Sequence, residues 1–225
     1  MVGARAIESR FEAQHEASLT PLVGREEELE LLLRRWRGAG DGDGAVVLIS
    51  GEPGIGKSRL IQTLLERLSG EPNARLRYYC SPHHQDTALY PTITQLERAA
   101  GFRRDDSDER RLAKLEAVLT RASNDLGEAV PLLAALLSLP TSDRYPPLNL
   151  TPQKGKEKTL KALVAQVEGL AACQPVLMVV EDAHWIDPTS LELLDLTVDR
   201  VPSLSALLII TFDQSSLRPG SAVRR

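Results

Sequence analysis

Apolar runs of strand length alternate with stretches of helical periodicity along this chain. Such runs predict β-strands at 46–50, 75–80, 176–180 and 207–211. The run at 75–80 alternates with polar residues, as in a strand near a sheet edge, whereas the later two are continuous, as in buried parallel strands. Between the strands, apolar residues recur three or four positions apart, which predicts helices with one buried face. This alternation predicts an α/β fold, a three-layer sandwich around a parallel sheet.

The stretch between the second and third strands is long and helical in pieces, so we predict additional helices inserted there. Three helix starts follow from capping residues: Asp106 or Ser107, Thr151 before Pro152, and Asp187 before a proline. For Asp106 a cap is favoured over a cation site, and for Asp187 a cap is favoured over a chemical role.

The two ends of the chain differ in pattern from its middle. Residues 1–20 carry scattered apolar positions amid charges, which predicts a linker or connecting helix. Residues 21–213 form the predicted domain, and 214–225 read as a disordered polar tail, which leaves the C-terminus of the fold incomplete. Because no fifth strand follows, we expect the sheet to be poorly covered on one side and the chain to be marginally stable or sticky.

Composition narrows the class of protein. The chain has 225 residues, of which 42% are hydrophobic and 26% charged, with a net charge of −4, as in an ordinary globular domain with no basic field for nucleic acid or membrane. No apolar run approaches the roughly 18 residues of a membrane-spanning helix, and no secretion signal is recognisable. Cys80 and Cys173 match no disulfide or zinc spacing, so we expect two reduced thiols and a cytoplasmic location.

A phosphate-binding motif follows the first strand. Gly51–Ser58 matches G-x-x-x-x-G-K-[ST] at every fixed position, and a strand precedes it and a helix follows, which argues against a chance glycine-rich turn. Glycines let consecutive backbone N–H groups approach phosphate oxygens at the helix N-terminus. We therefore predict binding of ATP and Mg²⁺, with Lys57 on the β- and γ-phosphates and Ser58 on the metal. The predicted nucleotide-binding residues here are Gly51, Glu52, Pro53, Gly54, Ile55, Gly56, Lys57, Ser58 and Arg59.

Two carboxylates, Glu181 and Asp182, end the apolar run at 176–180. Parallel strands deliver such residues to the carboxyl edge of the sheet, where ligands bind in open α/β folds. In a P-loop enzyme this position holds the acids that support Mg²⁺ through water and polarise the attacking water. We therefore predict catalytic roles for Glu181, Asp182 and Lys57.

Two histidine-containing loops invite chemical readings. Adjacent His83 and His84 suggest a metal, but neighbours in an extended segment point to opposite sides and no third ligand is spaced for them, so a loop over the site is favoured. His184 and Trp185 follow the acidic pair and either touch nucleotide or a partner, or pack their loop against the sheet, which we favour.

Together, the segments Leu22–Leu29, Ser50–Ser58, Val179–Leu194 and Leu207–Phe212 resemble the AAA-type ATPase module of bacterial multidomain regulators. That module includes the origin-recognition-like AAA domains and the signal-transduction ATPases with numerous domains (STAND). It occurs in transcription activators and, most like this sequence, after the catalytic domain of class III adenylate/guanylate cyclases. The resemblance runs from about Thr20 to Phe212.

The resemblance implies how nucleotide would be held. ATP would lie between a helical layer and the sheet, with Gly24 and Arg25 near the adenine. Glu181 would serve the Mg²⁺ through water and Asp182 would be the base, although many relatives read Asp-Glu and the two roles could be exchanged. The implied strand order places the Val46 strand centrally, between the strands at 207–211 and 176–180.

One departure from the family pattern bears on activity. The family usually continues its last strand into an arginine that senses the γ-phosphate, whereas Thr211-Phe212 is followed here by Asp213. Loss of that positive charge removes stabilisation of the transition state, so binding is expected to survive better than hydrolysis.

Three functions remain open at this point. The first is a nucleotide-dependent signalling switch for a protein partner or fused output domain, with slow hydrolysis. The second is a steady-turnover ATPase working as an oligomer, and the third is a degenerate scaffold with a vestigial pocket. The intact Lys57 and Ser58 argue against the scaffold, whereas the incomplete C-terminus argues for it. The stretch before Thr20 is too short for a cyclase domain, so we do not expect cyclase activity from this chain itself.

Overall fold

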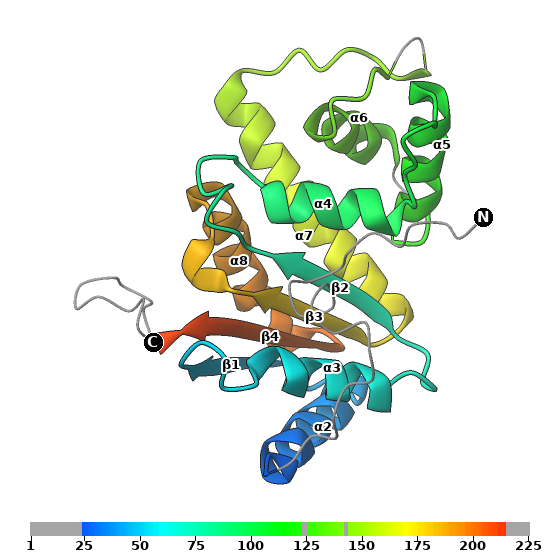
Figure 1. Cartoon of the computed structure of the whole chain (residues 1–225). Helices are drawn as coiled ribbons and strands as arrows, with labels where there is room; N and C mark the ends of the chain where they lie inside the picture. Colours follow the sequence, from blue (N-terminus) through cyan, green and yellow to red (C-terminus); the bar gives the residue numbers. More distant parts are fainter. Residues whose placement is uncertain (1–23, 123–125, 142–143, 215–225) are drawn as a thin grey trace.

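A parallel sheet runs through the centre of the molecule, with its strands in the order β1–β4–β3–β2 (Figure 1). The computed structural model describes residues 24–122, 126–141 and 144–214. The predicted strands are confirmed with small shifts at their ends. They are β1 (Ala45–Gly51), β2 (Ala74–Tyr79), β3 (Val176–Glu181) and β4 (Ala206–Asp213).

The predicted strand order was wrong. β4 lies between β1 and β3, so that Val47 pairs with Ile209 and Ile209 with Val179, and β1 forms an edge of the described sheet. The physical reason is that a central strand must be apolar on both faces. The first six residues of β4 are buried, whereas Leu48 of β1 is 53% exposed. The apolar run in β1 therefore does not mark a central strand.

Helices cover both faces of the sheet and confirm the α/β sandwich (Figure 1). α2 and α3 pack on one face, and α7 and α8 on the other. The helices are α2 (Glu26–Gly40), α3 (Lys57–Arg67), α4 (Tyr90–Ala99), α5 (Asp108–Leu119), α6 (Leu126–Leu136), α7 (Pro152–Cys173) and α8 (Pro188–Arg200), with short 3-10 turns η2 (Ala183–Trp185) and η3 (Val201–Ser203).

Each central strand supplies side chains to two hydrophobic cores. In β4, Leu207 and Ile209 pack toward α2 and α3, while Leu208 and Ile210 pack toward α7 and α8. This alternation follows from the two-residue period of a strand. The cores on the two faces hold the carboxyl ends of β1, β3 and β4 together at one edge, where the phosphate motif and the acidic pair lie.

The additional helices predicted between β2 and β3 are present as α4, α5, α6 and the first part of α7 (Figure 1). They enclose a third hydrophobic core that contains Leu96, Leu115 and Leu133. The predicted caps are confirmed: Ser107 accepts a hydrogen bond from the Arg110 backbone N–H and Thr151 from that of Lys154. The predicted linker at 1–20 lies outside the described residues, as does all of the predicted tail except Gln214.

Candidate nucleotide-binding site

The motif Gly51–Ser58 forms the turn between β1 and α3, as its sequence predicts. Gly54 and Gly56 have φ of +80° and +98°, a region that side chains with a Cβ rarely adopt. At Gly51, an added Cβ would lie 2.9 Å from Cγ2 of Ile55, so any larger residue there would displace the Ile55 side chain. The result is a loop whose backbone N–H groups precede the N-terminus of α3.

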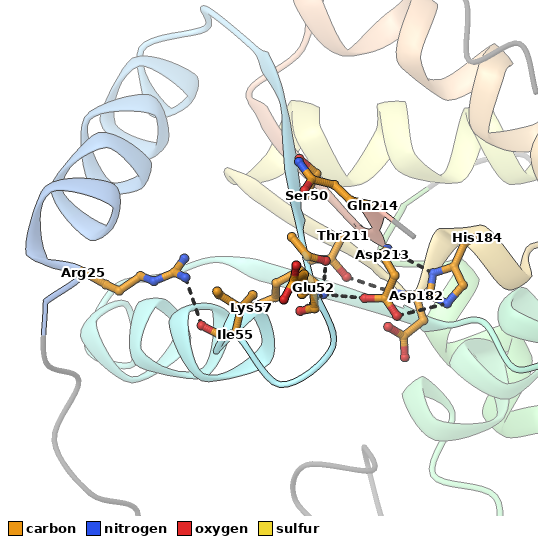
Figure 2. Close-up of polar contacts among 11 residues, drawn as sticks. Arg25, Ser50, Glu52, Ile55, Lys57, Asp182, His184, Thr211, Asp213 and Gln214 are labelled. Carbon is orange, nitrogen blue, oxygen red and sulfur yellow. Dashed lines mark hydrogen bonds and ion pairs between the residues drawn. The ribbon is translucent and has the colours of Figure 1, made fainter. Parts of the chain in front are cut away.

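Lys57 is the first residue of α3 and is only 8% exposed. Its Nζ donates to the carbonyl oxygens of Gly51 and Glu52 at 3.0 and 3.1 Å, and to Oδ1 of Asp213 at 2.5 Å (Figure 2). An ammonium group has three N–H donors, so these contacts use all of them. The lysine of the phosphate motif thus forms an ion pair with the last residue of β4.

Asp213 joins Lys57 to the loop that follows β3 (Figure 2). Its Oδ2 lies 3.5 Å from Nε2 of His184, and its backbone N–H donates to Nδ1 of the same ring at 3.3 Å. Asp213 and His184 have side chains that are 17% and 8% exposed. The aspartate that replaces the expected arginine therefore sits in a largely buried cluster with the candidate phosphate-binding lysine.

Glu181 and Asp182 lie at the carboxyl end of β3, as predicted, but in different environments. Glu181 is 5% exposed, and Nη2 of Arg77 donates to its Oε1 at 2.7 Å. Burial raises the pKa of Glu181 above its ordinary value, while Arg77 and a hydrogen bond from Ser58 oppose that rise. Ser58 and Glu181, the two predicted Mg²⁺ residues, are therefore in contact.

Asp182 adopts the left-handed conformation, with φ 55° and ψ 43°. Its backbone N–H donates to Oγ1 of Thr211 at 3.1 Å, which links the end of β3 to β4 (Figure 2). A non-glycine residue in this region stores backbone strain, and such strain clusters at functional sites. The turn places the two acids on successive, differently oriented residues.

Arg25, directly before α2, reaches the phosphate motif. Its Nη2 donates to the Ile55 carbonyl at 2.9 Å (Figure 2). Its Nη1 lies 3.8 Å from Oε1 of Glu28. Gly24 precedes it with a φ of +72°. Arg59, on the first turn of α3, has Nε and Nη1 buried without a hydrogen-bond partner among the described residues. The structure thus brings Arg25 to the loop, while Arg59 keeps unused donors.

The remaining predicted residues have structural contacts. Oδ1 of Asp187 accepts from the backbone N–H groups of Thr189 and Ser190 at 3.0 and 2.9 Å, so its capping role is confirmed. Trp185 packs against the core under β3 and β4, as favoured. The His84 ring stacks on Tyr90 with centroids 3.6 Å apart.

Two contacts at the candidate site were not predicted from the sequence. Asp213 was predicted as a missing arginine, not as a partner of Lys57, because the residues are 156 positions apart. Arg77 was read only as a polar position of an edge strand, yet it pairs with Glu181 across the sheet. Their strand positions carry the one available signal. Asp213 ends β4, which pairs with β1, the strand before the phosphate motif, and Arg77 lies on β2, which pairs with β3, the strand that ends in Glu181.

The donor set fits a Mg²⁺-bound triphosphate. The loop offers N–H groups and a helix N-terminus for phosphate oxygens, Lys57 offers a cation, and Ser58 with Glu181 offers oxygen ligands of the kind Mg²⁺ prefers. When bound, Mg²⁺ would neutralise part of the phosphate charge. The orphaned donors of Arg59 are a further observation in favour of an anionic ligand near α3.

Comparison with known protein families matches residues 21–210 to the AAA ATPase domain. The chain belongs to the AAA ATPase domain family. It is therefore a nucleotide-binding ATPase module, and the phosphate motif lies within the matched part of the AAA ATPase domain. The resemblance read from the sequence is confirmed at this level, and its finer assignment to signalling ATPases or cyclase fusions is taken up below.

Two further comparisons place this AAA ATPase domain among known proteins. It is 31% identical over 191 residues to an uncharacterized protein of Rhizobium meliloti (strain 1021), covering 85% of this chain and 18% of that protein. The chain thus spans less than a fifth of the length of that relative. It is also similar to the crystal structure of Cdc6p from Pyrobaculum aerophilum, with 16% identity, a TM-score of 0.46, and coverage of 90% of this chain and 42% of that one. Among the described helices, none combines the length and apolar character needed to cross a membrane.

Proposed function

We propose that this chain is the ATP–Mg²⁺-binding regulatory module of a larger protein and works as a nucleotide-dependent switch. The observation that carries the proposal is the contact between Lys57 and Asp213. It joins the phosphate motif, which would bind the nucleotide, to the last residue of β4. Nucleotide occupancy would therefore bear directly on the segment that follows β4.

Electrostatic repulsion indicates how nucleotide binding would change the contact between Lys57 and Asp213. The β- and γ-phosphates of ATP would bring negative charge to Lys57, whose donors are already used by two carbonyls and Asp213. Two anions close to one buried ammonium repel each other by several kcal/mol at an effective dielectric of about 20. Lys57 would turn to the phosphates, and Asp213 would move away with the end of β4.

The remaining residues have roles that follow from their positions. Ser58 and Glu181 would hold Mg²⁺, Glu181 through water, and Asp182 would orient or deprotonate the attacking water. By the family resemblance, Gly24 and Arg25 would lie beside the base, and the hydrogen bond from Arg25 to the Ile55 carbonyl holds this segment next to the phosphate motif. Arg59 would supply its unused donors on the same side of α3.

Slow hydrolysis is part of the proposal. A cation at the γ-phosphate stabilises the charge that develops in phosphoryl transfer, and removing one costs orders of magnitude in rate. Asp213 places an anion at the end of β4 instead. The phosphate-binding residues are intact, whereas the end of β4 carries an anion. This combination favours a long-lived ATP-bound state, as in a switch, over rapid turnover.

The partner would be the rest of a longer protein. The Rhizobium relative is much longer than this chain, since the matched part covers 18% of it. By the resemblance quoted above, output domains of the cyclase or transcription-regulator type are the candidates we propose. The output domain would respond to nucleotide occupancy through the position of the end of β4.

The test is calorimetric titration of ATP–Mg²⁺ into the chain and into Lys57→Ala, followed by phosphate release from the same samples. Lys161→Ala serves as the control, because Lys161 is an exposed lysine of α7 with a side chain 72% exposed. We expect binding that Lys57→Ala abolishes and Lys161→Ala preserves, with phosphate release slower than about one per minute.

The other outcomes identify the alternatives. Phosphate release at several per second would replace the switch with a turnover ATPase. Absence of binding to the parent chain, verified as folded by circular dichroism, would leave a scaffold with a vestigial pocket. Equal binding by Lys57→Ala and the parent would place the nucleotide elsewhere on the molecule.

A further inference from the structure

A cavity of about 440 Å³ lies between α3, β2 and α4. The described residues that line it do not include the phosphate motif. Its volume is in the range of small-molecule sites, which are roughly 300–1,000 Å³. The polar residues among its lining are Gln62, Glu66, Ser69, Arg75, Arg77, Gln95 and Arg98.

Two of the arginines are held in place by neutral oxygen atoms. Arg75 donates from Nε to Oδ1 of Asn73 at 2.8 Å and from Nη2 to the Leu68 carbonyl at 2.7 Å. Arg98 donates from Nε to the Thr94 carbonyl at 3.1 Å and from Nη2 to the Arg77 carbonyl at 2.8 Å. Each guanidinium is thereby oriented by two bonds, while its Nη1 takes part in neither.

The charge of these two arginines is not balanced by their partners. Carbonyl and amide oxygens accept hydrogen bonds but carry no net charge, and no ion pair among the described residues includes Arg75 or Arg98. Arg77 lines the same cavity and is paired with Glu181. Tyr79 lies under both Arg77 and Arg98, with its ring centroid 5.1 and 4.8 Å from their Cζ atoms. Glu66 is the one acidic residue among the described residues of the lining, so the three arginines leave the cavity wall with a net positive charge.

Guanidinium groups fixed in this way match a phosphate group. Their planar forks bind phosphate oxygens with paired, charge-assisted hydrogen bonds, and pre-orientation reduces the entropy lost on binding. Gln62, Gln95 and Glu66 supply amide and carboxylate groups that suit the hydroxyls of a small organic molecule. We propose that this cavity, between α3 and α4, is a second anion site that binds the phosphate group of a small phosphorylated metabolite.

A simpler explanation for part of this arrangement is protection of a sheet edge. Charged residues on an edge strand discourage pairing with another chain, and β2 is an edge of the described sheet. That explanation accounts for arginines at alternate positions of β2. Arg98 of α4 also fits it in part, because its Nη2 satisfies the Arg77 carbonyl of this edge strand. Edge protection alone does not require that guanidinium groups from α4 and β2 line one cavity.

The test titrates inorganic phosphate and glycerol phosphate into the Lys57→Ala chain, in which the phosphate motif is disabled. The same titration into the parent chain saturated with ATP–Mg²⁺ covers the case in which Lys57→Ala does not fold. If the proposed ATP binding fails instead, the Lys57→Ala arm still tests this cavity. The probing variant is Arg75→Gln/Arg98→Gln, and the control is Arg34→Gln/Arg35→Gln, which removes the same charge from exposed positions of α2.

We expect phosphate to bind with a Kd below about 1 mM and the Arg75→Gln/Arg98→Gln variant to bind at least about tenfold more weakly, with no change in the control. Tighter binding of glycerol phosphate than of inorganic phosphate would assign an organic phosphate, and equal binding would assign the free ion.

Binding that the variant leaves unchanged overturns the proposal. So does absence of binding to either probe, or binding of an acidic peptide in preference to both. Self-association of the variant without any loss of phosphate binding would show that the arginines protect the edge instead.

Discussion

Two lysine–aspartate pairs in this molecule have the same contact distance and different consequences. Lys57 and Asp213 approach to 2.5 Å, as do Lys114 and Asp106. Both lysines also donate to backbone carbonyls, Lys57 to those of Gly51 and Glu52 and Lys114 to that of Gly101. The distances alone therefore do not distinguish a structural brace from a contact that a ligand can break.

The difference lies in what surrounds each pair. Asp106 and Lys114 are 8 positions apart, and the carboxylate also accepts from the Arg103 backbone N–H at 2.8 Å and lies 3.4 Å from Arg110. This local pair closes the turn before α5, and its lysine is 25% exposed. The Lys57–Asp213 pair instead joins the first residue of α3 to the end of β4 beside a glycine-rich loop, with a lysine that is 8% exposed. Asp106 is held by several groups of its own turn, so its pair with Lys114 is structural. Lys57 would instead meet a competing anion, the phosphates of the proposed ligand.

The largest expected effect comes from reversing the charge at the end of β4. Asp213→Arg should raise phosphate release by about a hundredfold, because it supplies a cation where transition-state charge develops. Single-turnover assays with ATP–Mg²⁺ measure this rate. An unchanged rate in a variant that still binds ATP would show that the missing arginine is not what limits hydrolysis.

Neutralising the same residue should change affinity. Asp213→Asn should tighten ATP–Mg²⁺ binding by about tenfold, because the phosphates no longer compete with a carboxylate for Lys57. The nucleotide-free variant should also unfold more easily, by about 3 kcal/mol, since a largely buried ammonium loses its counter-ion. The matched control is Asp106→Asn. Calorimetry on that variant should give the affinity of the parent, and a shift of equal size would contradict the comparison.

The local pair should govern stability against acid. Hydrogen bonds from Lys114 and from the Arg103 N–H lower the pKa of Asp106 below its ordinary value. A carboxylate with a depressed folded pKa stabilises the fold above its unfolded pKa, about 3.9, and loses that contribution as pH falls through the folded value. The parent should therefore exceed Asp106→Asn in stability at neutral pH, and the gap should shrink below about pH 4. Urea unfolding across this range measures it, and a gap that widens in acid would refute the assignment.

The smallest effect is expected at His184. His184→Gln removes the ring that accepts from the Asp213 backbone N–H, while a glutamine oxygen can accept in its place. ATP–Mg²⁺ affinity should change by no more than about threefold, because the charges at Lys57 and Asp213 remain. Filter-binding with labelled ATP measures this. A loss as large as that of Lys57→Ala would make His184 a direct ligand.

Local sequence signals predicted the elements of this fold well. The fixed positions of Gly51–Ser58 and the cap at Asp187 depend on neighbours within a few residues, so the sequence alone identifies them. The strand order could not be predicted in this way. The apolar runs of β1 and β4 are alike in sequence, and only packing reveals that Leu48 is exposed while Leu208 is fully buried.

The same limit applied to the candidate site. The motif predicted Lys57 and Ser58, and the end of an apolar strand predicted Glu181. The partners Asp213 and Arg77 could not be predicted because their contacts cross the sheet between distant segments. A charged residue near the carboxyl end of a neighbouring parallel strand signals such contacts, but the neighbour is known only once the strand order is known.

The most direct test of the central claim follows Trp185 while nucleotide binds. Its ring lies 4.9 Å from that of His184, which contacts Asp213, so release of Asp213 alters its surroundings. In a Trp36→Phe background, Trp185 is the remaining tryptophan. The account predicts that ATP–Mg²⁺ shifts its emission, that AMP does not, and that Asp213→Asn abolishes the shift. ATP binding by calorimetry with no change in emission would contradict the claim that nucleotide separates Asp213 from Lys57.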